Sequence, residues 1–142
     1  MNVPKLVLPL DVVAAVKADA KAERRVVDLE HFDSVPWDWS FLDIGPKTIK
    51  EYTRIIEKSK TVFWNGPLGV VEIPAFAHGT ISIADAIAKS HAKSIVGGGD
   101  TEGALKAAHL TKKFDYVSTG GGASLEFLSG AELPVLKYLS VS

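Results

Sequence analysis

Five short apolar runs divide the chain and predict β-strands. They are rich in β-branched and aromatic residues and end close to Gly, Pro, Asn or Asp, as strands often do. The predicted strands are Leu6–Leu8, Arg25–Leu29, Thr61–Trp64, Ser94–Val96 and Tyr116–Ser118. The segment from Asp11 to Ala22 is expected to be helical or irregular.

Between the later strands the apolar positions change to a helical spacing. In the segment 48–60, for example, Ile49, Tyr52 and Ile56 fall on one face of a helix, and Pro46 just ahead of the segment suits a helix start. The predicted helices are Thr48–Lys60, Pro74–Ser90, Ala104–Leu110 and Ala123–Leu128. Strands that alternate with helices predict an α/β fold, a three-layer parallel sheet with helices on both faces.

Three of the predicted strands run directly into glycine-bearing loops. The loops contain Asn65-Gly66-Pro67, Gly97-Gly98-Gly99-Asp100-Thr101 and Ser118-Thr119-Gly120-Gly121-Gly122. Because parallel strands all end on the same edge of a sheet, these loops should meet there, where open α/β sheets bind ligands. Glycine lets the backbone approach a ligand closely, and a helix start that follows offers N–H groups to phosphate.

Each glycine loop has a plainer interpretation as a tight turn between a strand and a helix. Two glycine triplets that each close a strand are harder to explain as turns alone, since glycine weakens regular structure. The sequence contains neither a Gly-x-x-x-x-Gly-Lys-Ser/Thr loop nor a Gly-x-Gly-x-x-Gly after the first strand. The loops themselves also lack the lysine or arginine that phosphoryl transfer commonly uses.

Two acidic residues accompany the loops. Asp100 could hold Mg²⁺ that is already bound to nucleotide phosphates, because Mg²⁺ often takes only one or two protein carboxylates. Its alternative role is that of a helix N-cap, which Asp and Thr both favour. Glu72 could accept hydrogen bonds from ribose hydroxyls, or it could be an ordinary exposed acid.

Composition narrows the classes of function. The chain has 142 residues, a net charge of -1 and no cysteine, so thiolate metal sites, thiol nucleophiles and disulfides are excluded. This balance does not suggest a basic nucleic-acid-binding face. No stretch approaches the ~20 apolar residues that cross a bilayer, and Pro9 and Asp11 interrupt the opening apolar run, so a cytoplasmic location is expected.

Five segments together resemble phosphoglycerate kinases, in the family's order and at about its spacing. The segments are 42–48 (LDIGPKT), 64–72 (WNGPLGVVE), 75–80 (AFAHGT), 97–101 (GGGDT) and 118–126 (STGGGASLE). One such loop is a weak signal, but five in order are specific. The resemblance implies a transferase of glycolysis that moves a phosphoryl group between 1,3-bisphosphoglycerate and ADP with Mg²⁺, giving 3-phosphoglycerate and ATP.

The resemblance also implies roles for individual residues. Glu72 would bind the ribose, and Asn65 and Pro67 would line the nucleotide site. The Gly98-Gly99-Asp100-Thr101 segment would meet the phosphates of ATP or ADP, with Asp100 on the metal. Gly99 and the Gly120-Gly121-Gly122 triplet would stabilise the transferring group through backbone N–H donors.

The resemblance covers roughly the last third of the family's length. Residues 1–142 are therefore expected to form one partial domain, the C-terminal nucleotide-binding half, which is inactive when isolated. 3-Phosphoglycerate would bind only through the absent N-terminal domain, which a complementing chain could supply. Phe41 stands where the family usually has a glycine beside the adenine, and its ring could stack on the base or block it. The alternatives are a non-catalytic Mg-nucleotide-binding fragment, an association module and a non-functional gene remnant.

Overall fold

The chain forms two three-stranded sheets joined by two helices. The computed structural model describes residues 6–133. The antiparallel sheet, in the order β2-β1-β3, contains β1 (Asp11–Ala15), β2 (Arg24–Asp28) and β3 (Ser40–Ile44). The parallel sheet, in the order β4-β5-β6, contains β4 (Thr61–Asn65), β5 (Lys93–Gly97) and β6 (Tyr116–Ser118). The helices are α1 (Pro46–Glu57), α2 (His78–Lys89), α3 (Gly99–Ala107) and α4 (Gly121–Leu128).

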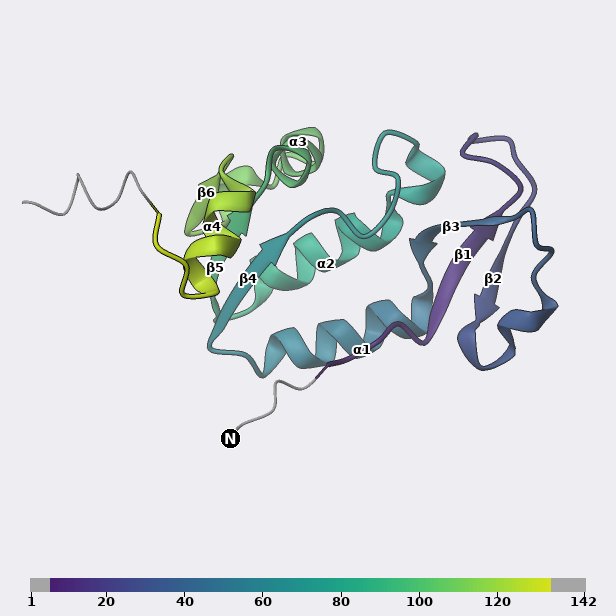
Figure 1. Cartoon of the computed structure of the whole chain (residues 1–142), viewed down its shortest axis with the longest axis horizontal. Coiled ribbons are helices and arrows are strands. Elements are labelled where there is room, and N and C mark those ends of the chain that lie inside the picture. The colour runs from purple at the N-terminus through teal and green to yellow at the C-terminus, as the bar shows by residue number, and fades with distance from the viewer. Residues whose placement is uncertain (1–5, 134–142) are drawn as a thin grey trace, which may run out of the picture.

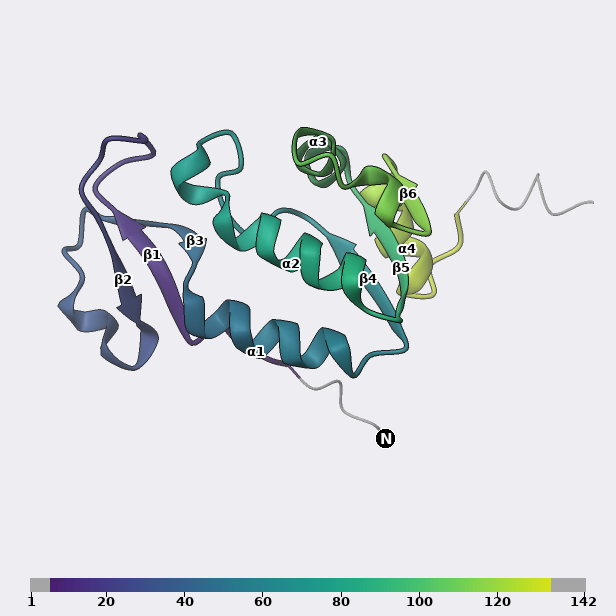
Figure 2. The same ribbon diagram turned by 180° about the vertical axis from the view of Figure 1, so that it is seen from behind.

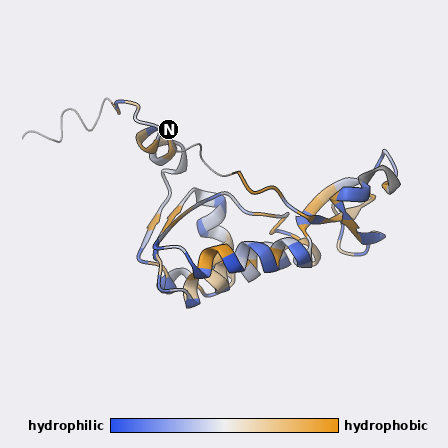
Figure 3. Cartoon of the chain, turned by 90° about the horizontal axis from the view of Figure 1, so that it is seen from below, coloured by the Kyte–Doolittle hydropathy of each residue, from blue (hydrophilic) through white to orange (hydrophobic). Residues whose placement is uncertain are grey.

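Helices α1 and α2 lie side by side between the two sheets (Figures 1 and 2). Within residues 6–133 there are also three short 3-10 segments, at Leu29–Ser34, Pro74–Phe76 and Thr111–Lys113. Viewed from below, α1 has hydrophilic residues interrupted by apolar ones, in keeping with its position at the surface (Figure 3). None of the helices within residues 6–133 has the length and apolar character needed to cross a bilayer.

The parallel sheet confirms the predicted α/β class. Its main core lies on the face that packs against α2 and α3. Every second residue of a strand points to this face and contacts the helices. The buried members of this core are Ile44, Ile56, Trp64, Ile83, Ala84, Ile87, Val96, Leu105 and Phe114. A smaller cluster of Val12, Ala14 and Val27 holds the antiparallel sheet together.

The opposite face of the parallel sheet is covered only in part. Helix α4 lies beside it and leaves a groove of about 430 Å³ between sheet and helix. Apolar side chains dominate the groove, and three of them are largely exposed: Tyr116 at 61%, Phe127 at 58% and Leu128 at 61%. This face is a contiguous apolar surface of the kind that folded domains normally cover.

The antiparallel sheet was not predicted. Strand β1 occupies the segment that was expected to be helical or irregular, and β3 was missed altogether. β1 is the central strand, and four of its five residues are buried, so its sequence shows no alternation of polar and apolar residues. Conversely, Leu6–Leu8 is apolar but is not a strand, and Leu6 and Leu8 are exposed. A strand requires a hydrogen-bonding neighbour, which apolar composition alone does not provide.

The starts of α3 and α4 were placed too late along the chain. Both helices begin inside the glycine triplets, at Gly99 and Gly121, instead of at Ala104 and Ala123. Glycine has a low intrinsic helix propensity, which favours a later start on sequence grounds. At these two positions tertiary packing overrides that propensity, and glycine N–H groups become the first turn of each helix.

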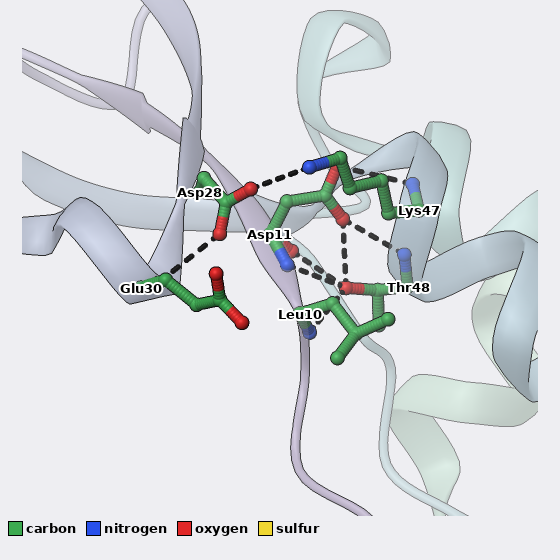
Figure 4. Close-up of polar contacts among 6 residues, drawn as sticks. All are labelled: Leu10, Asp11, Asp28, Glu30, Lys47 and Thr48. Carbon is green, nitrogen blue, oxygen red and sulfur yellow. Dashed lines mark hydrogen bonds and ion pairs between the residues drawn. The ribbon is translucent and has the colours of Figure 1, made fainter.

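A buried carboxylate joins the antiparallel sheet to α1 (Figure 4). Asp11 is 1% exposed, and its side chain accepts hydrogen bonds from the N–H groups of Lys47 (3.0 Å) and Thr48 (2.8 Å). The Thr48 hydroxyl donates to Asp11 and accepts from the N–H groups of Leu10 and Asp11. Gly45, the residue at the N-cap of α1, has no side chain that could cap the helix. Asp11 of β1 therefore caps the helix instead.

We expect Asp11→Asn to lower the free energy of unfolding by about 1–3 kcal/mol, because the amide nitrogen would face one of the two N–H groups and leave it buried and unsatisfied. Urea denaturation measures the change, with Asp38→Asn at an exposed position as the control. Equal stabilities of the two variants would contradict the capping role.

Candidate nucleotide-binding rim

The three strands of the parallel sheet end in register. Asn65 of β4 pairs with Gly97 of β5, and Gly97 pairs with Ser118 of β6. The loops that follow these residues therefore begin side by side at the carboxyl edge of the sheet. We call this edge, formed by residues 65–72, 97–101 and 118–122, the rim.

The three loops are in direct contact at the rim. A Cβ atom placed on Gly121 would lie 2.6 Å from Asn65 Oδ1 and 2.8 Å from Gly98 Cα, both closer than real Cβ atoms approach other groups. One placed on Gly98 would lie 2.9 Å from the same Asn65 oxygen. The predicted convergence of the glycine loops is thus confirmed, and only glycine fits at its centre.

Hydrogen bonds fix the loops to one another. The Gly66 N–H donates to Thr101 Oγ1 at 2.9 Å, and the Gly98 N–H donates to the Ser118 carbonyl at 2.9 Å. Gly66 and Gly98 have φ of 94° and 100°, a region that favours glycine. Thr101 is fully buried, so its hydroxyl serves the contact with Gly66.

Two helix starts point their donors at the rim. Gly99, Asp100 and Thr101 form the first turn of α3, while Gly121 and Gly122 open α4. The first N–H groups of a helix have no carbonyl partner within the helix, and the helix dipole adds partial positive charge. By contrast, the Gly120 N–H is already bonded to Ser118 Oγ at 3.1 Å. The rim therefore offers neutral amide donors suited to an anion.

The acidic residues of the rim are accessible. Asp100 and Glu72 are both exposed, Asp100 in the first turn of α3 and Glu72 in the turn closed by the Ile73 N–H and the Val70 carbonyl. The neighbouring Glu102 is engaged by Lys106 on the same helix. Pro67, which was predicted to line the site, is partly buried just after Gly66.

No group of three His, Cys, Asp or Glu residues within the described part of the chain could hold a metal by itself. A divalent cation at Asp100 would thus take most of its ligands from a bound molecule or water. Mg²⁺ that arrives on nucleotide phosphates fits this donor set, because it commonly uses one or two protein carboxylates.

The sequence did not identify the residues that hold the rim in place. Asp43 and Thr80 are buried polar residues behind the Asn65 loop, and the Thr80 hydroxyl accepts the Leu68 N–H at 2.9 Å. The available signal was an acidic residue inside the apolar segment Phe41-Leu42-Asp43-Ile44. A charged residue that is buried in such a segment is usually paired or hydrogen-bonded.

Comparison with known proteins agrees with this geometry. The model of the family described as "Phosphoglycerate kinase" matches residues 2–131. The phosphoglycerate kinase of Corynebacterium aurimucosum is 50% identical over 140 residues, which make up 95% of this chain and 34% of that protein. The phosphoglycerate kinase of Prosthecochloris aestuarii is 51% identical over 139 residues, covering 96% of this chain and 34% of that protein.

Solved structures show the same fold. The phosphoglycerate kinase of Coxiella burnetii aligns with a TM-score of 0.84 at 46% identity, covering 92% of this chain and 33% of that one. That of Pyrococcus horikoshii aligns with a TM-score of 0.76 at 38% identity, covering 91% and 31%. The chain thus spans about a third of the length of these relatives. Since the family model covers nearly all of its residues, the chain belongs to the phosphoglycerate kinase family.

Proposed function

We propose that the rim binds the Mg²⁺ complex of an adenine nucleotide and forms the nucleotide side of the phosphoglycerate kinase reaction. In that reaction ADP takes a phosphoryl group from 1,3-bisphosphoglycerate, which gives ATP and 3-phosphoglycerate. The observation that carries the proposal is the contact of Asn65, Gly98 and Gly121 at one sheet edge. Family membership supplies the chemistry, and the amide donors of two helix starts suit the phosphates.

Each element of the rim has a role in this proposal. The backbone N–H groups of Gly99 and Asp100, exposed in the first turn of α3, bind the phosphates, and the Asp100 carboxylate faces the metal. Glu72 accepts hydrogen bonds from the ribose, while Asn65 and Pro67 line the site. Mg²⁺ would neutralise phosphate charge in a rim whose loops contain no Lys or Arg.

The glycine triplet after β6 faces the group that is transferred. Backbone N–H donors of Gly121 and Gly122 act on the oxygens of the phosphoryl group, where negative charge is spread in the transition state. These donors belong to the start of a helix, so they need no reorganisation as the reaction proceeds. Gly120 orients the triplet through the bond between its N–H and Ser118 Oγ.

In this proposal, the glycerate substrate binds to the part of the kinase that lies outside these 142 residues. The chain spans a third of its relatives, and the rim loops provide no cation for a phosphoglycerate. We propose that the other two thirds, in the same polypeptide or in a complementing chain, cover the apolar face of Tyr116, Phe127 and Leu128. The same observation favours the second candidate function, a nucleotide-binding or association module without turnover.

Two measurements on the 142-residue chain separate these functions. Isothermal titration with MgADP tests binding. ATP formation from 1,3-bisphosphoglycerate tests catalysis, first with the 142-residue chain alone and then with the other two thirds of the kinase taken from a relative. Turnover only in the mixture supports the kinase half-site. Nucleotide binding without turnover in the mixture supports the binding module. Absence of nucleotide binding in a folded chain overturns the half-site and the nucleotide-binding module, and leaves association as the remaining function.

We expect Asp100→Asn to weaken MgADP binding about 10- to 100-fold, the range that corresponds to a hydrogen bond or contact with a charged group. Metal-free ADP should bind the variant as well as, or better than, the wild type, because a carboxylate repels phosphate. Titration with and without Mg²⁺ measures both effects. The control is Glu102→Gln, in the same helical turn but paired with Lys106. An equal loss without Mg²⁺ would show that Asp100 acts only on helix stability.

We expect Gly121→Ala to destabilise the chain by about 1–3 kcal/mol, since the new methyl group would overpack against Asn65 and Gly98. MgADP affinity of the folded variant should also fall, because the loops would be pushed apart. The control is Gly103→Ala in α3, where an added Cβ meets nothing within 4 Å. It should leave binding unchanged and raise stability slightly. Thermal unfolding and titration compare the two, and similar effects would rule out crowding as the cause.

A further inference from the structure

A second buried aspartate lies behind the rim. Asp43, at the end of β3, is 4% exposed, and its Oδ2 accepts the Gly79 N–H at 2.8 Å in the first turn of α2. Its Oδ1 accepts the Ile44 N–H at 2.9 Å. Burial raises the pKa of the Asp43 carboxyl above its ordinary 3.8, and these N–H donors oppose the shift. Ala77, at the N-cap of α2, has no side chain that could cap the helix, so Asp43 caps it from a strand.

The same carboxylate is in contact with the loop between β4 and α2. A Cβ placed on Gly69 would lie 2.5 Å from Asp43 Oδ1 and 2.3 Å from the Phe76 carbonyl. The loop therefore crosses directly over the carboxylate, which only glycine permits at position 69. Asp43 thus contacts the start of α2 and the middle of a rim loop at once.

Two further hydrogen bonds hold this loop. The Leu68 N–H donates to Thr80 Oγ1 at 2.9 Å, and the Val70 N–H donates to the Leu42 carbonyl at 2.9 Å. Thr80 is 1% exposed and sits in α2 beside the Gly79 N–H that Asp43 accepts. The Leu68–Val70 segment is thus clamped between the end of β3 and the start of α2.

The clamped segment leads directly into the turn that carries Glu72. That turn is closed by the Ile73 N–H and the Val70 carbonyl at 3.0 Å. The Glu72 side chain is exposed, and no hydrogen bond or ion pair to it occurs within residues 6–133. The backbone beneath it, which Asp43 and Thr80 hold, therefore sets the region that the Glu72 carboxylate can reach.

We infer that Asp43 and Thr80 are positioning residues that set the ribose contact of Glu72. The inference rests on the proposed nucleotide-binding function and deepens it. Asp43 and Thr80 do not touch the nucleotide themselves. They act by fixing the loop from Leu68 to Val70, so that the loop backbone need not reorganise when the Glu72 side chain reaches the ribose hydroxyls.

Asp11 provides a matched control. It is a buried aspartate that caps α1 from a strand, as Asp43 caps α2. Its carboxylate also packs against a glycine, because a Cβ on Gly45 would lie 2.3 Å from Asp11 Cγ. Asp11 contacts α1 and no loop of the rim. Substitution of either aspartate by asparagine removes one acceptor from a helix cap, but only Asp43→Asn disturbs the Glu72 turn.

The test compares ADP with 2′,3′-dideoxy-ADP, each with Mg²⁺, by titration of wild type, Asp43→Asn and Asp11→Asn in the full chain. Wild type and Asp11→Asn should prefer ADP by about tenfold or more, as expected for hydroxyl contacts with a charged acceptor. Asp43→Asn should lose most of that preference, with little change for the dideoxy nucleotide. A general loss of stability would instead lower the affinity for both nucleotides by the same factor.

Thr80→Val and Thr80→Ser provide a second measurement if Asp43→Asn fails to fold. Valine removes the oxygen that accepts the Leu68 N–H, whereas serine keeps it, so only Thr80→Val should lose ribose preference. An unchanged preference in Asp43→Asn or, failing that variant, in Thr80→Val would overturn the inference and leave the proposed function intact. A wild-type chain that binds neither nucleotide, or binds both equally, would overturn the inference together with the role of Glu72.

Discussion

The structure depends on the close approach of three backbones at the carboxyl edge of a small parallel sheet. Asn65, Gly98 and Gly121 lie so near one another that a single added methyl group would separate them. This constraint explains the middle glycine of each triplet, Gly98 and Gly121, better than loop flexibility does. It also brings the starts of α3 and α4 together, so that their unpaired N–H groups address a common volume.

Two buried aspartates connect the antiparallel sheet to the helices next to the parallel sheet. Asp11 and Asp43 lie on neighbouring antiparallel strands, and each caps a helix that leads into or out of the parallel sheet. Burial of a carboxylate is costly unless N–H donors surround it, and both residues have such donors. The antiparallel sheet therefore does more than extend the fold, since it fixes the helices α1 and α2 that flank β4.

The carboxyl edge could be predicted from the sequence because its signals are local. A strand followed by glycines and a helix indicates both the sheet class and the place of the loops, as at Ile95–Thr101. β1 and β3 could not be predicted, because burial of both sides of β1 removes alternation and because Asp43 resembles a loop residue. The roles of Asp43 and Thr80 depend on contacts 36 and 12 residues apart in sequence, which no local pattern encodes.

The electrostatics of the rim fit a half-site better than a complete one. Its loops contribute amide donors, two exposed carboxylates and no Lys or Arg, a set suited to the proposed nucleotide if Mg²⁺ reduces the charge of its phosphates. A second anionic substrate would meet carboxylates here with no cation to offset them, so its binding charge has to come from elsewhere. The exposed apolar face beside α4 lies on the same sheet as the rim, next to the Gly120–Gly122 triplet. Under the proposed function, a body that covered this face would lie beside the triplet, where it could supply the cations that the rim loops lack.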